Sequence, residues 1–271
     1  MNAEGTAVVT GASRGIGRAV ALELANRGFD VLATMRSTEM GADLVEEVAA
    51  TGGALRVERL DVTDPDSIHF PEELRVLVNN AAVEREHPAF EATPMELWRD
   101  MFETNVFGLI EVTRQAIPAL RRAGGGVVCN ISSSSILAPV PFYAPYRSSK
   151  AAIGAIGESL RAELAPFGVR VLEILPGPID TDMLAGSAKP PAAIEDPDYR
   201  AMAERYFEGR SAIDDQVTSS ADAAIAIVDA ILDDDAPLRV GCDPMAIAML
   251  DAWRTTPDED LMRAMLATWT G

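Results

Sequence analysis

The start of the chain places the strongest constraint on its fold. A short apolar strand, Thr6–Thr10, breaks into a turn containing Gly11, Gly15 and Gly17, and a helical pattern follows as far as Arg27. Glycines allow a tight turn and the close approach of a ligand, and the free N–H groups at a helix start face an anion. The Gly-x-x-x-Gly-x-Gly spacing differs from the best-known dinucleotide fingerprint. It indicates a phosphate-binding turn, with an ordinary strand-to-helix turn as the alternative.

Strands and helices alternate along the rest of the chain. The expected strands are Thr6–Thr10, Asp30–Met35, Ala54–Leu60, Arg75–Val78, Val127–Ile131, Val169–Leu175 and Leu238–Gly241. Further helices are expected at about 40–50, 94–122, 146–166 and 221–232, in a tail at 244–269, and as a short helix ending near Pro71. This order predicts the α/β class, with one doubly wound, Rossmann-type parallel sheet in a single domain over 1–271. The long connection 183–215, with two short helices expected, suggests a lid or substrate loop.

Composition narrows the classes of function. With 271 residues, 48% of them hydrophobic, the chain can bury one large core. Its formal charge of −19 repels phosphate backbones and anionic lipid, so nucleic-acid and membrane-surface roles are not expected. The sequence shows no signal peptide and no apolar run long enough to span a bilayer, so a cytoplasmic location is expected. Cys129 and Cys242 are expected to be reduced, buried and inert.

The end of the second strand bears on the choice of cofactor. In a doubly wound sheet the residue there reads the adenosine ribose, and an acid would bind the 2′-hydroxyl of NAD. This chain has Met35 followed by Arg36, while Asp30 stands at the opposite end of the strand. Arg36 and Arg14 of the glycine turn could bind a 2′-phosphate by charge-assisted hydrogen bonds. NADP(H) is therefore predicted over NAD(H), with two merely solvated arginines as the alternative.

Tyr146 and Lys150 share one face of a predicted helix. An ammonium beside a phenol favours the ionised phenol, so we expect Lys150 to lower the pKa of Tyr146 from about 10 towards working pH. Such a phenol can exchange a proton with a carbonyl oxygen or an alcohol. The pair alone is weak evidence, because it also occurs by chance on exposed helix faces. Asn105, inside an apolar helical stretch, is expected to have a buried partner.

Together these motifs resemble those of the short-chain dehydrogenase/reductase family over essentially the whole chain. Asn79–Ala82 is similar to the family's Asn-Asn-Ala-Gly, with Ala82 in place of the glycine. The family's spacing before its catalytic tyrosine selects Ser133 over Ser132, Ser134 and Ser135. The catalytic residues implied by the resemblance are Asn105, Ser133, Tyr146 and Lys150. The implied cofactor-binding residues are Gly11, Ser13, Arg14, Gly15, Ile16, Gly17, Arg36, Asp61, Val62, Asn80, Ala81, Tyr146, Lys150, Pro176, Gly177, Ile179 and Thr181.

The resemblance also implies a strand order, a cofactor and a role for each catalytic residue. The expected order is 3-2-1-4-5-6-7, with NADP(H) across the switch point between strands 1 and 4, and assembly into homodimers or homotetramers. Tyr146 is expected to act as the general acid in carbonyl reduction. Lys150 would lower its pKa and bind the nicotinamide ribose, and Ser133 would donate to the substrate oxygen. Asn105 would hold a water for proton return.

The resulting function is an NADPH-dependent carbonyl reductase that works reversibly as an alcohol dehydrogenase. A dehydratase or epimerase with recycled cofactor, and a non-catalytic NADP(H)-binding regulator, are the alternatives. We expect an apolar substrate pocket and therefore a bulky, mostly apolar ketone or secondary alcohol. Its expected lining is Leu137, Val140, Phe142, Tyr143, Met183, Leu184, Tyr199, Met202, Tyr206 and Phe207.

Three further features of the sequence allow less specific predictions. The methionines and tryptophans of the tail are expected to pack in the core or at a subunit interface, with a lid over the substrate as the alternative. His87 is expected to be a solvated loop residue, with substrate contact as the alternative. No metal site is expected, because His69 and His87 lack ligand spacing.

Overall fold

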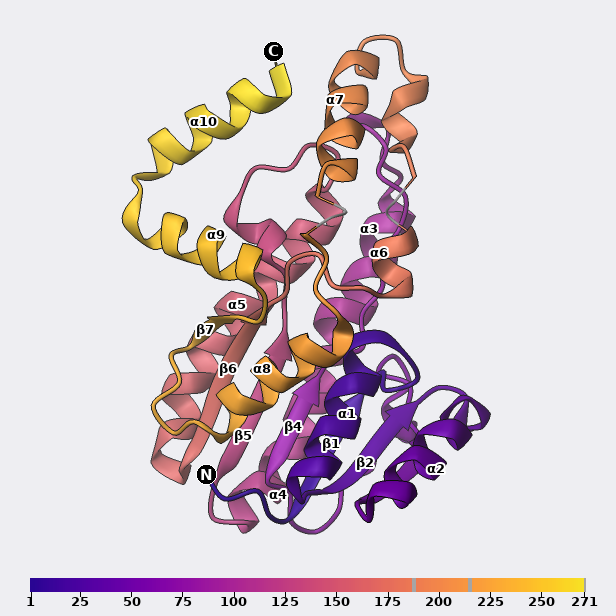
Figure 1. The fold of residues 1–271 in the computed structure, drawn as a ribbon, viewed down its shortest axis with the longest axis vertical. Helices are drawn as coiled ribbons and strands as arrows, with labels where there is room; N and C mark the ends of the chain where they lie inside the picture. The colour runs from indigo at the N-terminus through magenta and orange to yellow at the C-terminus, as the bar shows by residue number, and fades with distance from the viewer. Residues whose placement is uncertain (187–188, 214–215, 271) are drawn as a thin grey trace.

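The computed structural model describes residues 1–186, 189–213 and 216–270. Its centre is a seven-stranded sheet with the order β3-β2-β1-β4-β5-β6-β7, and every pairing between neighbours is parallel (Figure 1). The predicted order is therefore confirmed. The strands are β1 (Thr6–Thr10), β2 (Asp30–Met35), β3 (Ala54–Arg59), β4 (Val76–Asn79), β5 (Gly126–Ile131), β6 (Val169–Leu175) and β7 (Arg239–Gly241).

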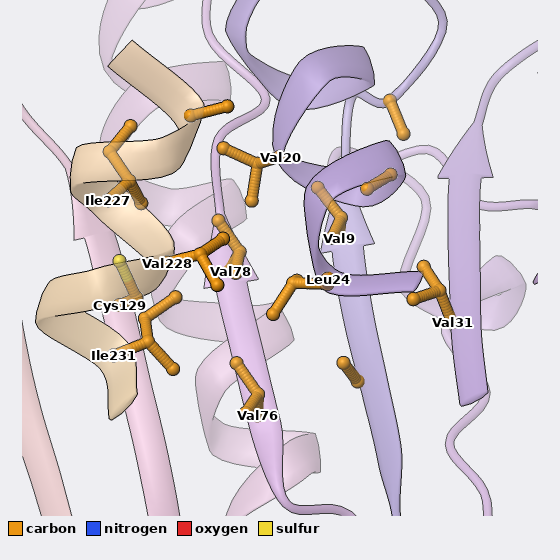
Figure 2. Packing of buried hydrophobic residues seen from close by; sticks show 14 of the residues in the cluster. Val9, Val20, Leu24, Val31, Val76, Val78, Cys129, Ile227, Val228 and Ile231 are labelled. Atoms are coloured by element: carbon orange, nitrogen blue, oxygen red, sulfur yellow. The ribbon is translucent and has the colours of Figure 1, made fainter. Parts of the chain in front are cut away.

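Helices cover both faces of the sheet, which explains why its central strands are apolar throughout. One face carries α1 (Gly15–Arg27), α2 (Ala42–Thr51) and α8 (Ser220–Leu232), and the other carries α4 (Leu109–Arg122) and α5 (Ala144–Leu164) (Figure 1). Side chains alternate between the two cores along each strand, as a pleated strand requires. Figure 2 shows Val76 and Val78 of β4 on the face of α1 and α8, whereas Leu77 packs into the opposite core.

The long helix predicted over 94–122 contains a local change of helix type. It begins as α3 (Met95–Phe102), continues as a π-helical segment (Glu103–Gly108) and ends as α4. A π-helical turn inside an α-helix is rare and is frequent at functional sites. Here it contains Asn105, and at Gly108 a Cβ would lie 2.7 Å from the Val62 side chain. The close packing of this helix against the 61–74 segment therefore depends on that glycine.

Two predicted helices differ in the structure. The segment 61–74 contains no α-helix, only a 3₁₀ turn at Pro65–Ser67, where the Ser67 hydroxyl receives the Asp61 N–H at 2.9 Å and donates to Asp64 O at 2.7 Å. Because these local hydrogen bonds satisfy the backbone, the short connection needs no helix. The tail is two helices, α9 (Pro244–Thr255) and α10 (Asp258–Thr270), because Pro257 cannot continue the hydrogen-bond pattern of the first.

The carboxyl ends of the strands face the segments that follow β6 and β7. The predicted lid contains α6 (Asp182–Gly186), a 3₁₀ turn at Ala192–Glu195 and α7 (Arg200–Ser211), and the tail helices α9 and α10 lie at the same end of the molecule (Figure 1). Cys129 and Cys242 are buried free thiols, as predicted. None of the helices described is long and apolar enough to cross a membrane.

Candidate active site

A cavity of about 560 Å³ opens at the carboxyl ends of the strands and extends under α7, α9 and α10. Of the predicted site residues, only Gly17 and Asn105 do not line it. Those that do are Gly11, Ser13, Arg14, Gly15, Ile16, Arg36, Asp61, Val62, Asn80, Ala81, Ser133, Tyr146, Lys150, Pro176, Gly177, Ile179 and Thr181. Residues from opposite halves of the sequence therefore meet around one space.

The glycine turn has the geometry of a phosphate cradle. Gly11 and Gly15 have φ angles of 65° and 56°, a left-handed conformation that favours glycine. A Cβ at Gly17 would collide with the Asn80 amide and lie 2.5 Å from Gly11 O. The Asn80 amide itself donates to Thr10 O at 2.9 Å and to Gly11 O at 3.1 Å, so it holds the turn in place. The open turn at the start of α1 fits the pyrophosphate of a dinucleotide.

Two arginines lie where the 2′-phosphate of NADP would be expected. Arg36 is exposed at the end of β2, and no hydrogen bond or ion pair engages its guanidinium within the described part of the chain. Arg14 is also exposed, and its Nη1 donates to Asp182 Oδ2 at 3.2 Å, which joins the glycine turn to α6. Burial opposes ionisation of Asp61, but hydrogen bonds from Thr63 and the nearby Arg36 charge lower its pKa overall. This end of the cavity is thus suited to an anionic group beside Arg36.

Tyr146 and Lys150 are both buried on α5 and both face the cavity. The Lys150 ammonium donates to Ile131 O at 2.9 Å and lies 5.7 Å from the centre of the Tyr146 ring. Burial lowers the pKa of Lys150 to about 8, although the charges of Glu84 and Glu173 act in the opposite direction. The pair therefore has the predicted arrangement on one helix face.

The expected lowering of the Tyr146 pKa is wrong for this structure. Burial and the negative charge of Glu84 raise the pKa of Tyr146, and the Ser133 hydroxyl only partly opposes them. A phenol in a low-dielectric site loses the hydration that would stabilise its anion. Tyr146 is consequently held in its protonated form, which is the form that can donate a proton.

The serines that follow β5, at positions 132–135, have different roles. Ser133 Oγ donates to Ser135 Oγ at 2.9 Å, and Ser133 lines the cavity together with Tyr146, whose pKa it lowers. Ser132 is 3% exposed and donates to Lys150 O at 3.2 Å, so its hydroxyl stabilises the backbone of α5. The structure thus brings Ser133, and not Ser132, to the phenol.

Asn105 has the buried partners that its position predicts. Its amide oxygen accepts from Val83 N at 2.8 Å, and its amide nitrogen donates to Val83 O at 2.9 Å and to Ser149 Oγ at 3.1 Å. The side chain therefore ties the π-helical segment to the strand after β4 and to α5. It lies behind the cavity wall, in contact with the helix that carries Tyr146.

The substrate end of the cavity has only part of its predicted lining. Val140, Tyr143, Met183, Leu184 and Tyr206 line it. The predicted residues outside the lining are Leu137, Phe142, Tyr199, Met202 and Phe207.

The tail also contributes to the lining, through Met245, Met249, Met265 and Trp269. Trp269 Nε1 donates to Pro139 O at 2.8 Å, and its carbonyl accepts from Arg205 Nε at 2.8 Å. The end of α10 is thereby attached to both the loop before α5 and the lid helix α7.

Two residues near the phenol were missed or misjudged from the sequence. His87 is only 9% exposed and stacks on Tyr143 with ring centres 4.0 Å apart, so its expected solvation is wrong. Glu84, which was not predicted, accepts from Tyr143 Oη and is paired with His87 Nε2, each at 2.9 Å. The available signal was an acid two residues after Asn-Asn-Ala-Ala, at the carboxyl end of β4.

A parallel, doubly wound sheet with a glycine turn after β1 and a Tyr–Lys pair at the same edge defines a class of dinucleotide-dependent α/β enzymes. The model of the family described as short chain dehydrogenase matches residues 5–191. The chain therefore belongs to the short-chain dehydrogenases/reductases, an oxidoreductase family that uses nicotinamide cofactors.

The individual relatives belong to the same family, but their names describe different activities. An uncharacterized oxidoreductase, YusZ of Bacillus subtilis, is 42% identical over 193 residues, which are 67% of each chain. An NADPH-dependent 1-acyldihydroxyacetone phosphate reductase of Schizosaccharomyces pombe is 35% identical over 83% of this chain and 78% of its own. A short chain dehydrogenase of Burkholderia cenocepacia, solved in complex with NADP, has a TM-score of 0.77 and 29% identity, covering 98% of this chain and 99% of its own.

Proposed function

We propose that this protein is an NADPH-dependent carbonyl reductase that also works in reverse as an alcohol dehydrogenase. The observation that carries the proposal is that Ser133, Tyr146 and Lys150 face the same cavity as the glycine turn. A proton donor, a hydroxyl that can bind the substrate oxygen and a cofactor cradle are thus within one space. This is the minimal set for reducing a carbonyl with a bound hydride donor.

The proposed cofactor is NADP(H). The glycine turn would hold the pyrophosphate, Arg36 and Arg14 the 2′-phosphate, and the segment from Pro176 to Thr181 the carboxamide. The name of the NADPH-dependent yeast relative and the NADP complex of the Burkholderia structure support this choice. When bound, this cofactor supplies or accepts the hydride.

The protein's own residues would manage the proton and the developing charge. Ser133 donates a hydrogen bond to the substrate oxygen, and Tyr146, kept protonated by its surroundings, gives its proton to that oxygen. Lys150 stabilises the resulting phenolate and binds the ribose of the cofactor. Asn105 holds the π-helical segment where a water would return the proton.

The proposed substrate is a bulky, mostly apolar ketone or secondary alcohol. Apolar and aromatic side chains from the lid and the tail support this, notably Met183, Tyr206, Met265 and Trp269. A phosphorylated substrate is the alternative suggested by the name of the Schizosaccharomyces pombe relative. Arg210 of α7 lines the cavity and would be the lid residue that binds the phosphate. Net dehydration or epimerisation with recycled cofactor, and NADP(H) binding without catalysis, are the other candidates.

We further propose a single cytoplasmic domain that forms a homodimer or homotetramer. The segment 183–215 would act as its substrate loop, although residues 187–188 and 214–215 lie outside the described residues. Exposed apolar side chains on α3 and the following segment, Met95 and Phe107, each 56% exposed, are consistent with burial against another copy.

The test is NADPH oxidation by the purified protein with a panel of hydrophobic ketones, keto acids and sugar phosphates. With the best ketone, Tyr146→Phe should lower kcat/KM by at least about a hundredfold while the protein still binds NADPH, because it removes the proton donor and leaves the other cofactor-binding residues in place. Tyr199→Phe is the matched control, since Tyr199 binds Glu91 at 2.7 Å and lies outside the cavity lining. Full turnover by Tyr146→Phe, or turnover without net NADPH loss, would contradict the proposal.

A further inference from the structure

A carboxylate stands at the substrate end of the cavity, and the proposed mechanism does not use it. Glu84 follows β4, lines the cavity and is 14% exposed. One of its oxygens, Oε1, is bonded to both Tyr143 Oη and His87 Nε2 at 2.9 Å. The stack of His87 on Tyr143, with an interplanar angle of 15°, fixes both donors. The orientation of Glu84 is therefore set by two buried aromatic groups.

The second oxygen of Glu84 is available to a ligand. No group in the described part of the chain donates to Oε2. This oxygen is also not fully buried, so a ligand in the cavity can reach it. Within the same residues, the only ion-pair partner of Glu84 is His87. A carboxylate with one oxygen satisfied and the other facing a cavity favours an N–H or O–H donor there and disfavours a second anion.

Glu84 is also close enough to the reacting group to act on the same substrate. The ring of Tyr143, which holds Glu84, lies 5.9 Å from the ring of Tyr146, edge to face. The charge of Glu84 acts on both Tyr146 and Lys150. The arginines proposed to bind the cofactor, Arg14 and Arg36, belong to the glycine turn and the end of β2, whereas Glu84 shares its part of the wall with Tyr143.

We infer that Glu84 determines specificity: it accepts a hydrogen bond from an ammonium or hydroxyl group carried by an otherwise apolar ketone, and it excludes carboxylates and phosphates. The inference rests on the proposed reductase function and narrows its substrate class. It also separates this chain from a reductase of phosphorylated substrates, because Glu84 would repel a phosphate from the space beside Tyr146.

The test uses acetophenones that share one skeleton and differ only in the para group: aminomethyl, hydroxymethyl, methyl or carboxylate. At pH 7 the wild-type protein should prefer the ammonium compound to the carboxylate by at least about a hundredfold in kcat/KM, with the hydroxymethyl compound ahead of the methyl one. Glu84→Gln keeps the acceptor for Tyr143 and removes the charge, so it should reduce the ammonium-to-carboxylate ratio by at least about tenfold. Glu86→Gln, an equal charge change at an exposed position of the same loop, should leave the ratio within about twofold.

Several results would overturn this inference without touching the reductase proposal. They are turnover of all four ketones at similar rates, a preference for the carboxylate, or an equal effect of Glu86→Gln. If no ketone is reduced, the reductase proposal fails instead. Calorimetric binding of the ammonium and carboxylate compounds to the NADP⁺-loaded wild-type protein then decides the role of Glu84. Equal affinities would refute it, and tighter binding of the ammonium compound would support it.

Discussion

Replacing Gly17 by alanine tests whether the glycine turn depends on space rather than on helix propensity. Gly17 lies inside α1, where alanine is intrinsically better than glycine by about 1 kcal/mol. The added Cβ would nevertheless collide with the Asn80 amide and lie 2.5 Å from Gly11 O, and a backbone oxygen cannot move aside as a flexible side chain can. Overpacking of this kind costs roughly 1–3 kcal/mol.

The same substitution also removes contacts that hold the turn. A displaced Asn80 amide loses its hydrogen bonds to Thr10 O and Gly11 O, each worth about 0.5–1.5 kcal/mol. When the gain in helix propensity is subtracted from these two costs, the free energy of unfolding is expected to fall by about 3 kcal/mol. NADPH affinity should fall at least about tenfold, because the cradle for the pyrophosphate changes shape.

The assay is urea unfolding at 25 °C together with NADPH titration by fluorescence. Gly157→Ala is the matched control: Gly157 is also a buried helical glycine, but the nearest atoms to its added Cβ are at 3.8 Å, an ordinary contact. It should be neutral or stabilising by up to about 1 kcal/mol. A Gly17→Ala protein as stable as the control, with unchanged NADPH affinity, would refute the steric argument.

Three other predictions follow from the same structure. The wild-type protein should prefer NADPH to NADH by at least about tenfold, and Arg36→Ala should shrink that ratio, whereas Arg56→Ala, which removes a residue paired with Asp30, should not. Burial lowers the pKa of Lys150 from 10.5 to about 8. Between these two pH values the unfolded chain binds more protons than the folded protein, so this group should make the free energy of unfolding increase as the pH rises from 8 to 10.5. Plots of unfolding free energy against pH for the wild-type and Lys150→Met proteins should therefore differ in slope over that range. Parallel plots would contradict the assigned burial. Light scattering at micromolar concentration should show a homo-oligomer, and a monomer would remove the proposed assembly.

The sequence alone determined the features that depend on neighbours along the chain. Alternating apolar strands and helices defined a parallel doubly wound sheet, because each strand must be covered on both faces by the helices that connect it. The glycine turn followed from its position between the strand Thr6–Thr10 and a helix. Tyr146 and Lys150 were placed on one face by helical periodicity, which needs no tertiary information. Motif order then placed these elements at the same edge of the sheet.

The tertiary structure decided what surrounds each of those groups. Glu84, His87 and Tyr143 form one cluster because the loop after β4 packs against the start of α5, a contact that no local pattern encodes. The pKa of Tyr146 rises instead of falling, since burial and the charge of Glu84 from another loop both raise it. Trp269 reaches the cavity only because the tail folds back onto Pro139. Periodicity determines which face of a helix a side chain occupies, whereas its dielectric surroundings and charged neighbours are set by segments far away in the sequence.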